Sequence, residues 1–222
     1  MCLIAFAIGA HPDSPLLLAG NRDEFFERPT APLHPWTPEG SGATIWAGRD
    51  LRDGGTWLGF ADTGRVAMLT NVRSAQPAAG PRSRGELPLR WLAGTSSLDA
   101  LAVSIDPAAY GGFNLVVGDF HTGQWAWLSN RSPQAPHTET AAPRLHRQQL
   151  EPGIYGLSNA VLDTPWPKTE RLKAAMHRAL GGQEGNAQAL LAEALADTAH
   201  APPHLQPDTG VPPELERALS SP

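Results

Sequence analysis

The chain has 222 residues, of which 41% are hydrophobic and 18% charged, a composition typical of a globular protein that excludes a largely disordered one. The net charge is -5 and the basic residues are scattered, which argues against a nucleic-acid partner. The apolar run at residues 3–10 is too short to cross a membrane and lacks the basic start of a secretory signal. Because Cys2 is the single cysteine, no intramolecular disulfide forms, and we predict a cytoplasmic protein without stable membrane insertion. No sequence feature indicates the oligomeric state.

The first half of the chain predicts mainly β-structure. Residues 3–8 form a continuous apolar run, as in a strand that is buried on both faces. A turn at residues 11–15 leads to a return strand at 16–19, and a second hairpin has strands at 56–60 and 66–70. Further strands are predicted at 113–117, 125–128 and 156–158.

Helices are predicted mainly in the second half, over residues 98–105, 168–180 and 187–199. The second of these carries apolar residues at helical spacing and ends at two glycines. Asn186 is suited to cap the third. Because strands come first and helices later, without regular alternation, we predict an α+β fold.

We predict one domain over residues 1–222. Five prolines make residues 201–213 an extended connector, and a short helix begins at Glu214. An isolated helix of about two turns is marginal in water, so we expect it to dock through Leu215 and Leu219.

The first hairpin places Cys2 beside a run of polar residues. If residues 11–15 form its loop, paired residue numbers sum to 26 and Cys2 lies opposite Glu24. A loop longer by one residue puts Asp23 in that place, and a slip of two still keeps Cys2 within the run. The hairpin therefore brings four polar side chains to the thiol: Asn21, Arg22, Asp23 and Glu24.

These groups suit nucleophilic catalysis. Removal of Met1 would leave Cys2 with a free α-amino group, which can take the proton of its own thiol. Arg22 would favour the thiolate, and Asp23 could orient the amine or the thiol. In the simpler alternative, Cys2 is a small buried hydrophobic residue and the polar run is a turn.

Two asparagines, Asn71 and Asn159, each follow an apolar strand. A carboxamide can donate a hydrogen bond to an oxyanion, although asparagine also commonly ends strands. Of the seven tryptophans, Trp57 and Trp166 lie near these residues in the sequence and are the candidates for substrate contact.

Together these residues resemble the NRDE family, also called the transport and Golgi organisation protein 2 family. The resemblance covers about residues 1–217. Its motifs are MC (1–2), GNRDE (20–24), ERP (27–29), GGTWLG (54–59), LTN (69–71), SRG (83–85), GFNL (112–115), GLSN (156–159) and LDTPWPK (162–168).

The family is in turn similar to N-terminal-nucleophile (Ntn) hydrolases of the choloylglycine hydrolase and penicillin acylase type. This resemblance implies a four-layer αββα sandwich. It also implies that Cys2 is the nucleophile, that Asp23 supports it, and that Asn71 and Asn159 donate to the oxyanion. The supporting or substrate-binding residues would be Asn21, Arg22, Glu24, Trp57 and Trp166.

Two departures from the pattern stand out. The acylases carry an arginine a few residues before the aspartate, and Arg22, directly before Asp23, does not fill that place. Family members also continue into a further strand after the helix that begins at Glu214, so we expect a C-terminal strand of the sandwich to be missing.

Two functions remain open. The first is an amidohydrolase or acyl transferase that acts on a non-peptide amide, ester or thioester through an acyl-Cys2 intermediate. The second is a non-catalytic binding or trafficking protein, since the resemblance also implies roles in Golgi organisation, secretion and haem or lipid homeostasis. The partner is a small acyl substrate or a lipophilic ligand. The sequence contains no His-Glu-x-x-His or Cys-x-x-Cys motif, and we predict no metal and no bound cofactor.

Overall fold

The structure is a computed structural model that describes residues 2–75, 80–138, 140, 142–182 and 186–222. Its contacts divide the chain into two compact units. The first comprises Met1–Asp23, Val72–Gln76 and Glu151–Pro222. The second comprises Glu24–Asn71 and Pro77–Leu150. Each unit is described by itself.

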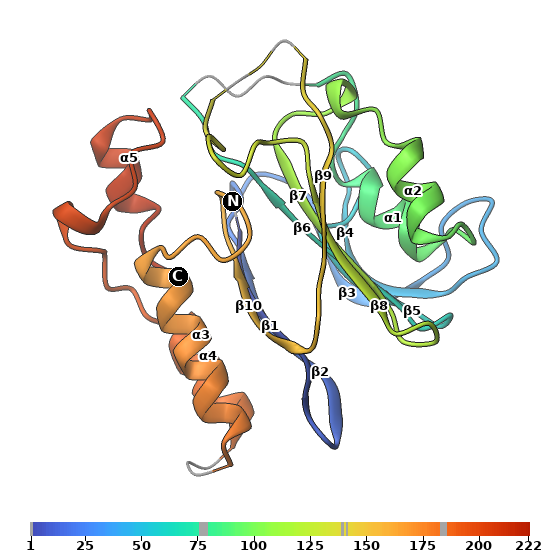
Figure 1. Ribbon diagram of the computed structural model, residues 1–222, viewed down its shortest axis with the longest axis horizontal. Helices are drawn as coiled ribbons and strands as arrows, with labels where there is room; N and C mark the ends of the chain where they lie inside the picture. Colours follow the sequence, from blue (N-terminus) through green and yellow to red (C-terminus); the bar gives the residue numbers. More distant parts are fainter. Residues whose placement is uncertain (1, 76–79, 139, 141, 183–185) are drawn as a thin grey trace. The chain divides into compact units, whose positions relative to one another are not determined.

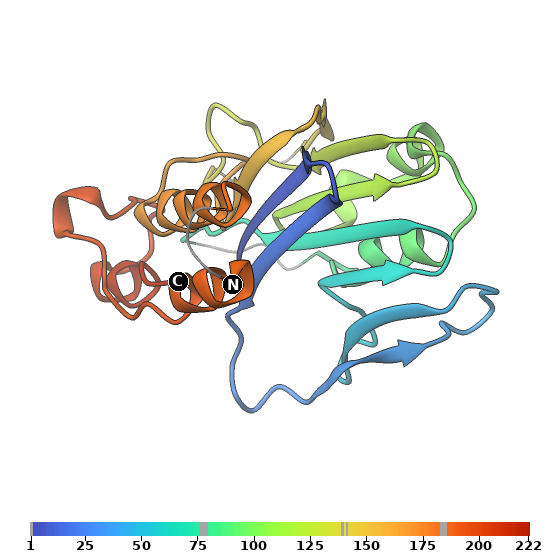
Figure 2. The same ribbon diagram turned by 90° about the horizontal axis from the view of Figure 1, so that it is seen from below.

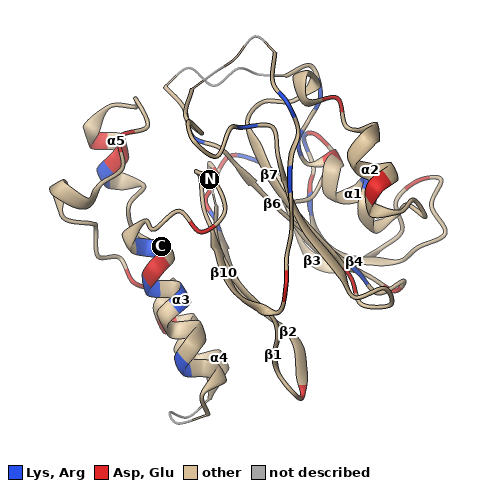
Figure 3. Cartoon of the chain, viewed as in Figure 1, with Lys and Arg blue, Asp and Glu red and all other residues tan. Residues whose placement is uncertain are grey.

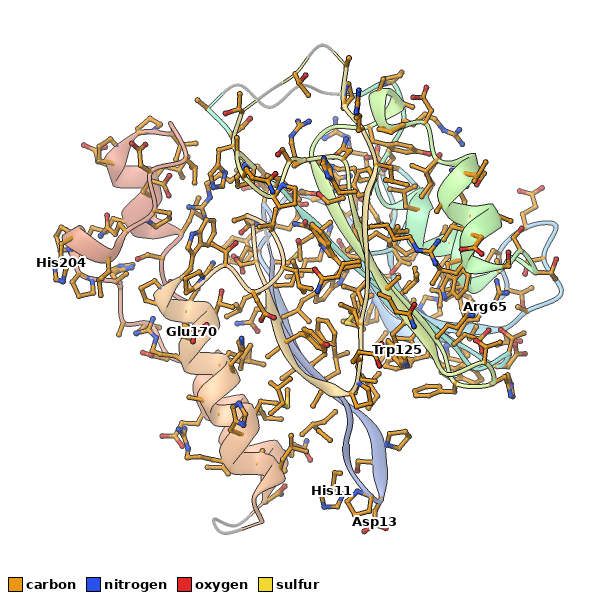
Figure 4. All side chains as sticks on the ribbon, in the orientation of Figure 1. His11, Asp13, Arg65, Trp125, Glu170 and His204 are labelled. Atoms are coloured by element: carbon orange, nitrogen blue, oxygen red, sulfur yellow. The ribbon has the colours of Figure 1, made fainter. Side chains whose placement is uncertain are left out.

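The first unit is built on a three-stranded antiparallel sheet in the order β10-β1-β2. Its strands are β1 (Cys2–His11), β2 (Ser14–Arg22) and β10 (Gly153–Leu157). The helices α3 (Pro167–Leu180) and α4 (Ala187–Leu195) lie along one face of this sheet (Figures 1 and 2). Figure 4 shows His11 and Asp13 at the tip of the β1–β2 hairpin, away from the helices.

Strand β1 is the central strand and is buried on both of its faces. Leu3 and Ala5 pack with Leu172 of α3 in one hydrophobic cluster. Ile4 and Phe6 point to the opposite face, because side chains alternate along a strand, and both are fully buried. The prediction of a doubly covered strand is therefore confirmed.

The last part of the first unit contains a short 3-10 helix, η2 (Pro203–Leu205), and α5 (Pro213–Ala218). Glu216 is the buried residue of α5, whereas Leu215 is 45% exposed. The carboxylate of Glu216 accepts a hydrogen bond from the backbone N–H of Thr209 at 2.9 Å and also bonds the guanidinium of Arg73. The expectation that α5 docks through Leu215 is wrong, because a buried acidic side chain anchors the helix instead.

The second unit is built on a seven-stranded antiparallel sheet in chain order, β3 to β9. Three helical segments accompany it: α1 (Glu86–Leu92), α2 (Leu98–Ser104) and the 3-10 helix η1 (Pro107–Ala109). The strands are β3 (Thr30–Trp36), β4 (Ile45–Asp50), β5 (Leu58–Ala61), β6 (Arg65–Asn71), β7 (Phe113–Asp119), β8 (Gln124–Ser129) and β9 (His146–Gln149).

Helices α1 and α2 cover one face of this sheet and share its main hydrophobic core (Figure 1). The indole N–H of Trp91 donates to the carbonyl oxygen of Gly118 at 3.0 Å. The guanidinium of Arg65, labelled in Figure 4, lies 4.1 Å from the centre of the Trp91 ring. A buried polar contact and a cation–π contact thus fix α1 on the sheet.

Each unit is therefore a sheet with helices on one face. Every strand pairing among the described residues is antiparallel, in agreement with the predicted α+β class. The strands β3, β4 and β9, the helix α1 and the two 3-10 helices η1 and η2 were not predicted. Within the described residues, no helix is both long and apolar enough to cross a membrane.

Candidate functional site

The β1–β2 hairpin sets the position of Cys2. Cys2 pairs with Arg22, so the two pairings that the loop length favoured, with Glu24 or Asp23, are wrong by two and by one residue. The turn is tighter than expected, because His11 pairs with Ser14. Strand β1 also holds one extra residue between Ile8 and His11, at a bulge beside Gly9, whose φ of 55° suits glycine. Cys2 nevertheless stays within the predicted polar run.

The Cys2 side chain is buried, with 6% of its surface exposed. In this chain, which still begins with Met1, burial raises the pKa of the thiol to about 11. The terminal amino group lowers that pKa, the Asp23 carboxylate raises it, and a hydrogen bond with the Asp23 backbone and the charge of Arg22 lower it. The thiol is therefore protonated at neutral pH unless more positive charge reaches it.

Lys168 lies in the first turn of α3 and faces Asp23. Its Nζ atom is 3.8 Å from Oδ2 of Asp23, and its side chain is 1% exposed. Among the described residues, Nζ has no hydrogen-bond partner. Burial lowers the pKa of Lys168 to about 8, Asp23 and Cys2 raise it, and Arg73 lowers it. Lys168 is thus a buried amine beside Asp23, and its charge is coupled to that of Cys2.

Arg73 brings a second buried cation to this part of the first unit. Its guanidinium bonds Glu216 and lies 5.0 Å from the centre of the Trp166 ring. Burial lowers the pKa of Arg73, whereas Glu216 and Asp23 raise it. The predicted substrate-contact residue Trp166 is 8% exposed and directly precedes α3. Asp23 therefore lies in the field of both Lys168 and Arg73.

Asn159 follows β10 and is fully buried. Its carbonyl oxygen accepts a hydrogen bond from the backbone N–H of Arg73 at 2.8 Å. The hydroxyl of Ser158 lies 3.2 Å from Oδ1 of Asn159 and 3.0 Å from the carbonyl oxygen of Cys2. These contacts hold Asn159 beside the first residue of β1.

The remaining predicted residues divide into two groups. Asn21 turns to the helical layer, where its amide nitrogen donates to the carbonyl oxygen of Leu195 at 2.8 Å. This contact fixes the end of α4 and gives Asn21 a structural role. The other three residues, Glu24, Trp57 and Asn71, belong to the second unit. There Asn71 ends β6 opposite Phe113.

Sequence reasoning missed Lys168 and Arg73 as members of the site. A signal for Lys168 was present: it lies four residues before Leu172 and seven before Ala175, on the buried stripe of α3. Figure 3 shows basic and acidic positions close together along this helix. A lysine on the apolar stripe of an otherwise amphipathic helix is unusual, because lysine is rarely fully buried.

Within the part of the chain that the structure describes, no three His, Cys, Asp or Glu side chains are grouped so that they could hold a metal ion. The Cys2 site instead combines the thiol, the Asp23 carboxylate and three cations, which are Arg22, Lys168 and Arg73. Such a set can stabilise an ionised thiol without a metal.

A family model described as transport and Golgi organisation 2 matches residues 1–222. This chain belongs to that family. It is 36% identical to the transport and Golgi organization protein 2 homolog of Bos taurus over 211 residues, 88% of this chain and 71% of that protein. It is 37% identical to the Homo sapiens homolog over 182 residues, 76% of this chain. That alignment covers 60% of the human protein.

Among solved structures, this transport and Golgi organisation 2 family member is similar to the Caenorhabditis elegans N-acylethanolamine-hydrolyzing acid amidase ortholog. The TM-score is 0.55 at 10% sequence identity, over 88% of this chain and 86% of that one. At this identity the likeness shows the fold alone. The chain therefore shares an α+β fold with that amidase ortholog, in agreement with the predicted fold class.

Proposed function

We propose that this family member is an Ntn-type enzyme that uses Cys2 to cleave, or to transfer the acyl group from, a small amide, ester or thioester. The observation that carries the proposal is the position of Cys2. It is the second residue of the chain, it pairs with Arg22, and it shares a hydrogen bond with the Asp23 backbone. The fold shared with an amide-hydrolysing enzyme supports the same reaction class.

The proposed reaction begins with removal of Met1, which makes the α-amine of Cys2 available as a base. The amine takes the thiol proton, and the thiolate attacks the carbonyl carbon of the substrate. The developing oxyanion receives a hydrogen bond from a carboxamide, for which Asn159 is the candidate in the first unit. The amine returns the proton to the leaving group as the acyl–leaving-group bond breaks. Water, or an acceptor nucleophile, then releases the acyl group from the Cys2 thioester.

The high pKa of the thiol in the chain that retains Met1 supports a need for processing. A thiol with a pKa of about 11 is almost entirely protonated at pH 7 and is a poor nucleophile. A free ammonium on the same residue would lie much closer to the sulfur than an amine one residue away. Processing is therefore expected to activate Cys2.

The test is an acyl adduct on Cys2. The processed chain is incubated with p-nitrophenyl esters and acyl thioesters of increasing length, and intact mass spectrometry measures the added acyl group. We expect one adduct, located on the N-terminal peptide, in the native chain and none in Cys2→Ala. A folded, processed chain that forms no adduct with any ester, thioester or amide probe would overturn the proposal.

A carrier predicts the opposite pattern. Its ligand would bind without a covalent adduct, and affinity would follow the apolar lining of the pocket. Titration with haemin, followed by the Soret band before and after Cys2→Ala, measures that outcome. Tight haemin binding together with the absence of any acyl adduct would favour a carrier.

A further inference from the structure

Lys168 is a buried cation whose placement the fold of α3 alone does not require. The chain contains two lysines, Lys168 and Lys173, both on α3. Lys173 lies at the helix surface, where its Nζ is 2.7 Å from Oδ1 of Asp163. Lys168 lies on the apolar stripe and is 1% exposed, without a hydrogen-bond partner among the described residues. A buried ammonium in this state destabilises the fold unless an anion compensates it.

Two anionic groups of the first unit can compensate Lys168. The first is Asp23, whose Oδ2 atom lies 3.8 Å from Nζ of Lys168, a distance longer than a hydrogen bond. Asp23 also lies in the field of Arg73, so its charge is shared between two cations. The second group is Cys2, which compensates Lys168 only when it is ionised. The charge of its thiolate raises the pKa of Lys168.

Coupling between two titrating groups is reciprocal. If a thiolate at Cys2 makes Lys168 easier to protonate, then a protonated Lys168 makes Cys2 easier to ionise by the same factor. Arg22 pairs directly with Cys2 and also favours the thiolate. Arg73 is already bonded to the carboxylate of Glu216. Lys168 adds a further positive charge, which is buried beside Asp23 and has no hydrogen-bond partner among the described residues.

We propose that Lys168 is a positioning residue whose ammonium offsets the charge of Asp23 and, in the processed chain, favours the anionic thiolate form of Cys2. In this step the thiol S–H bond breaks and its proton passes to the α-amine of Cys2 or to water, while Lys168 retains its own proton. The inference rests on the proposed role of Cys2 as a nucleophile and adds a residue from a different element of the fold.

The first test measures Cys2 alkylation by iodoacetamide against pH in the processed full chain. Compared with the native chain, Lys168→Met should raise the pH midpoint of alkylation by roughly one unit or more. At pH 7 the rate should fall about tenfold. Lys173→Met is the matched control, since it removes the other lysine of α3, and its profile should be unchanged. An unaltered midpoint in folded Lys168→Met would overturn the inference.

The second test does not need the Lys168 variant to fold. Lysine labelled with ¹³C at Cε gives one signal for each of the two lysines, and Lys173 serves as the internal reference. If Cys2 is a thiolate where Lys168 titrates, Cys2→Ala should lower the pKa of Lys168 and leave that of Lys173 in place. An identical Lys168 titration with and without the thiol would contradict the inference.

The two proposals can fail separately. If Lys168→Met forms normal acyl adducts at Cys2 and keeps the native alkylation profile, the role of Lys168 is rejected and the role of Cys2 as the nucleophile is supported. If the thiol pKa of the native chain is lower than that of free cysteine but no acyl adduct forms, the coupling between Lys168 and Cys2 is supported and the proposed enzymatic function is rejected.

Discussion

The hydroxyl of Ser158 lies 3.0 Å from the carbonyl oxygen of Cys2 and 3.2 Å from Oδ1 of Asn159. A hydroxyl has one proton, so it donates to one of these oxygens at a time. Ser158 thus connects the first residue of β1 to the residue that follows β10. One buried hydroxyl therefore contacts both Cys2 and Asn159.

Asn159→Ala is expected to lower turnover by roughly 10²–10³-fold, the usual loss for one oxyanion donor. Ser158→Ala removes a hydrogen bond to Cys2 or Asn159 but no proposed donor, so its effect on turnover should be much smaller. Steady-state kinetics with the best acyl probe checks both, and thermal melts report their stability. Equal losses in the two variants would indicate that Asn159 acts only through the local structure.

Retention of Met1 should keep the Cys2 thiol poorly reactive. A few residues added before Met1 block its removal, and the thiol pKa should then stay near 11. Because the thiolate is the reactive form, alkylation at pH 7 should be about a hundredfold slower than for free cysteine, and should rise about tenfold per pH unit up to pH 10. The processed chain should react faster at pH 7. Equal rates in both chains would contradict self-activation by the α-amine.

Lys168 should make stability depend on alkaline pH. Its pKa is about 8 in the folded chain against an ordinary value of 10.5 for lysine, so between these values the unfolded chain binds more protons. The free energy of unfolding should therefore rise with pH across this window, by about 3 kcal/mol in total. Urea melts of the native chain and of Lys168→Met at pH 7 and pH 10 check this.

Subtracting the free energy of unfolding of Lys168→Met from that of the native chain removes the contributions of the other titrating groups, which the two chains share. Lys168→Met should lack the rise and should be the more stable chain at pH 7, because it buries no charge. Lys173→Met should keep the rise. If the free energies of unfolding of the native chain and of Lys168→Met differ by the same amount at both pH values, burial does not disfavour the protonated form of Lys168.

The ion pair of Arg73 and Glu216 should anchor the C-terminal helix. Both side chains are at most 5% exposed, so Glu216→Gln leaves a buried guanidinium without its charged partner. We expect a loss of about 3–5 kcal/mol in the free energy of unfolding. Glu214→Gln, on the exposed side of α5, should change it by less than about 0.5 kcal/mol. Urea denaturation of both variants measures the difference.

Several elements could be predicted because their patterns are local. The apolar run of β1, the helical spacing of α3 and the Asn186 cap of α4 all appear in the structure as expected. The missed strands β3 and β9 are the two edges of the seven-stranded sheet. Two prolines interrupt β3, and β9 reads His-Arg-Gln-Gln without an apolar residue. Edge strands tolerate such sequences because one side forms no ladder.

By itself, the sequence determined that Cys2 starts a buried strand and that the returning strand brings the polar run to it. These are consequences of chain connectivity and of alternation along short strands. The exact partner, Arg22, depended on a bulge beside Gly9 that apolar patterning does not reveal. Local spacing therefore predicted the neighbourhood of the thiol and left the register open.

Only the tertiary structure decided which charges surround Cys2. Lys168 is 145 residues from Asp23 along the chain, and Arg73 is 143 residues from Glu216. Pairs so distant in sequence meet because α3 and α5 pack within the first unit, and no local pattern encodes that packing. Burial then sets their electrostatics, since the same lysine in water would keep an ordinary pKa and would have no influence on a distant thiol.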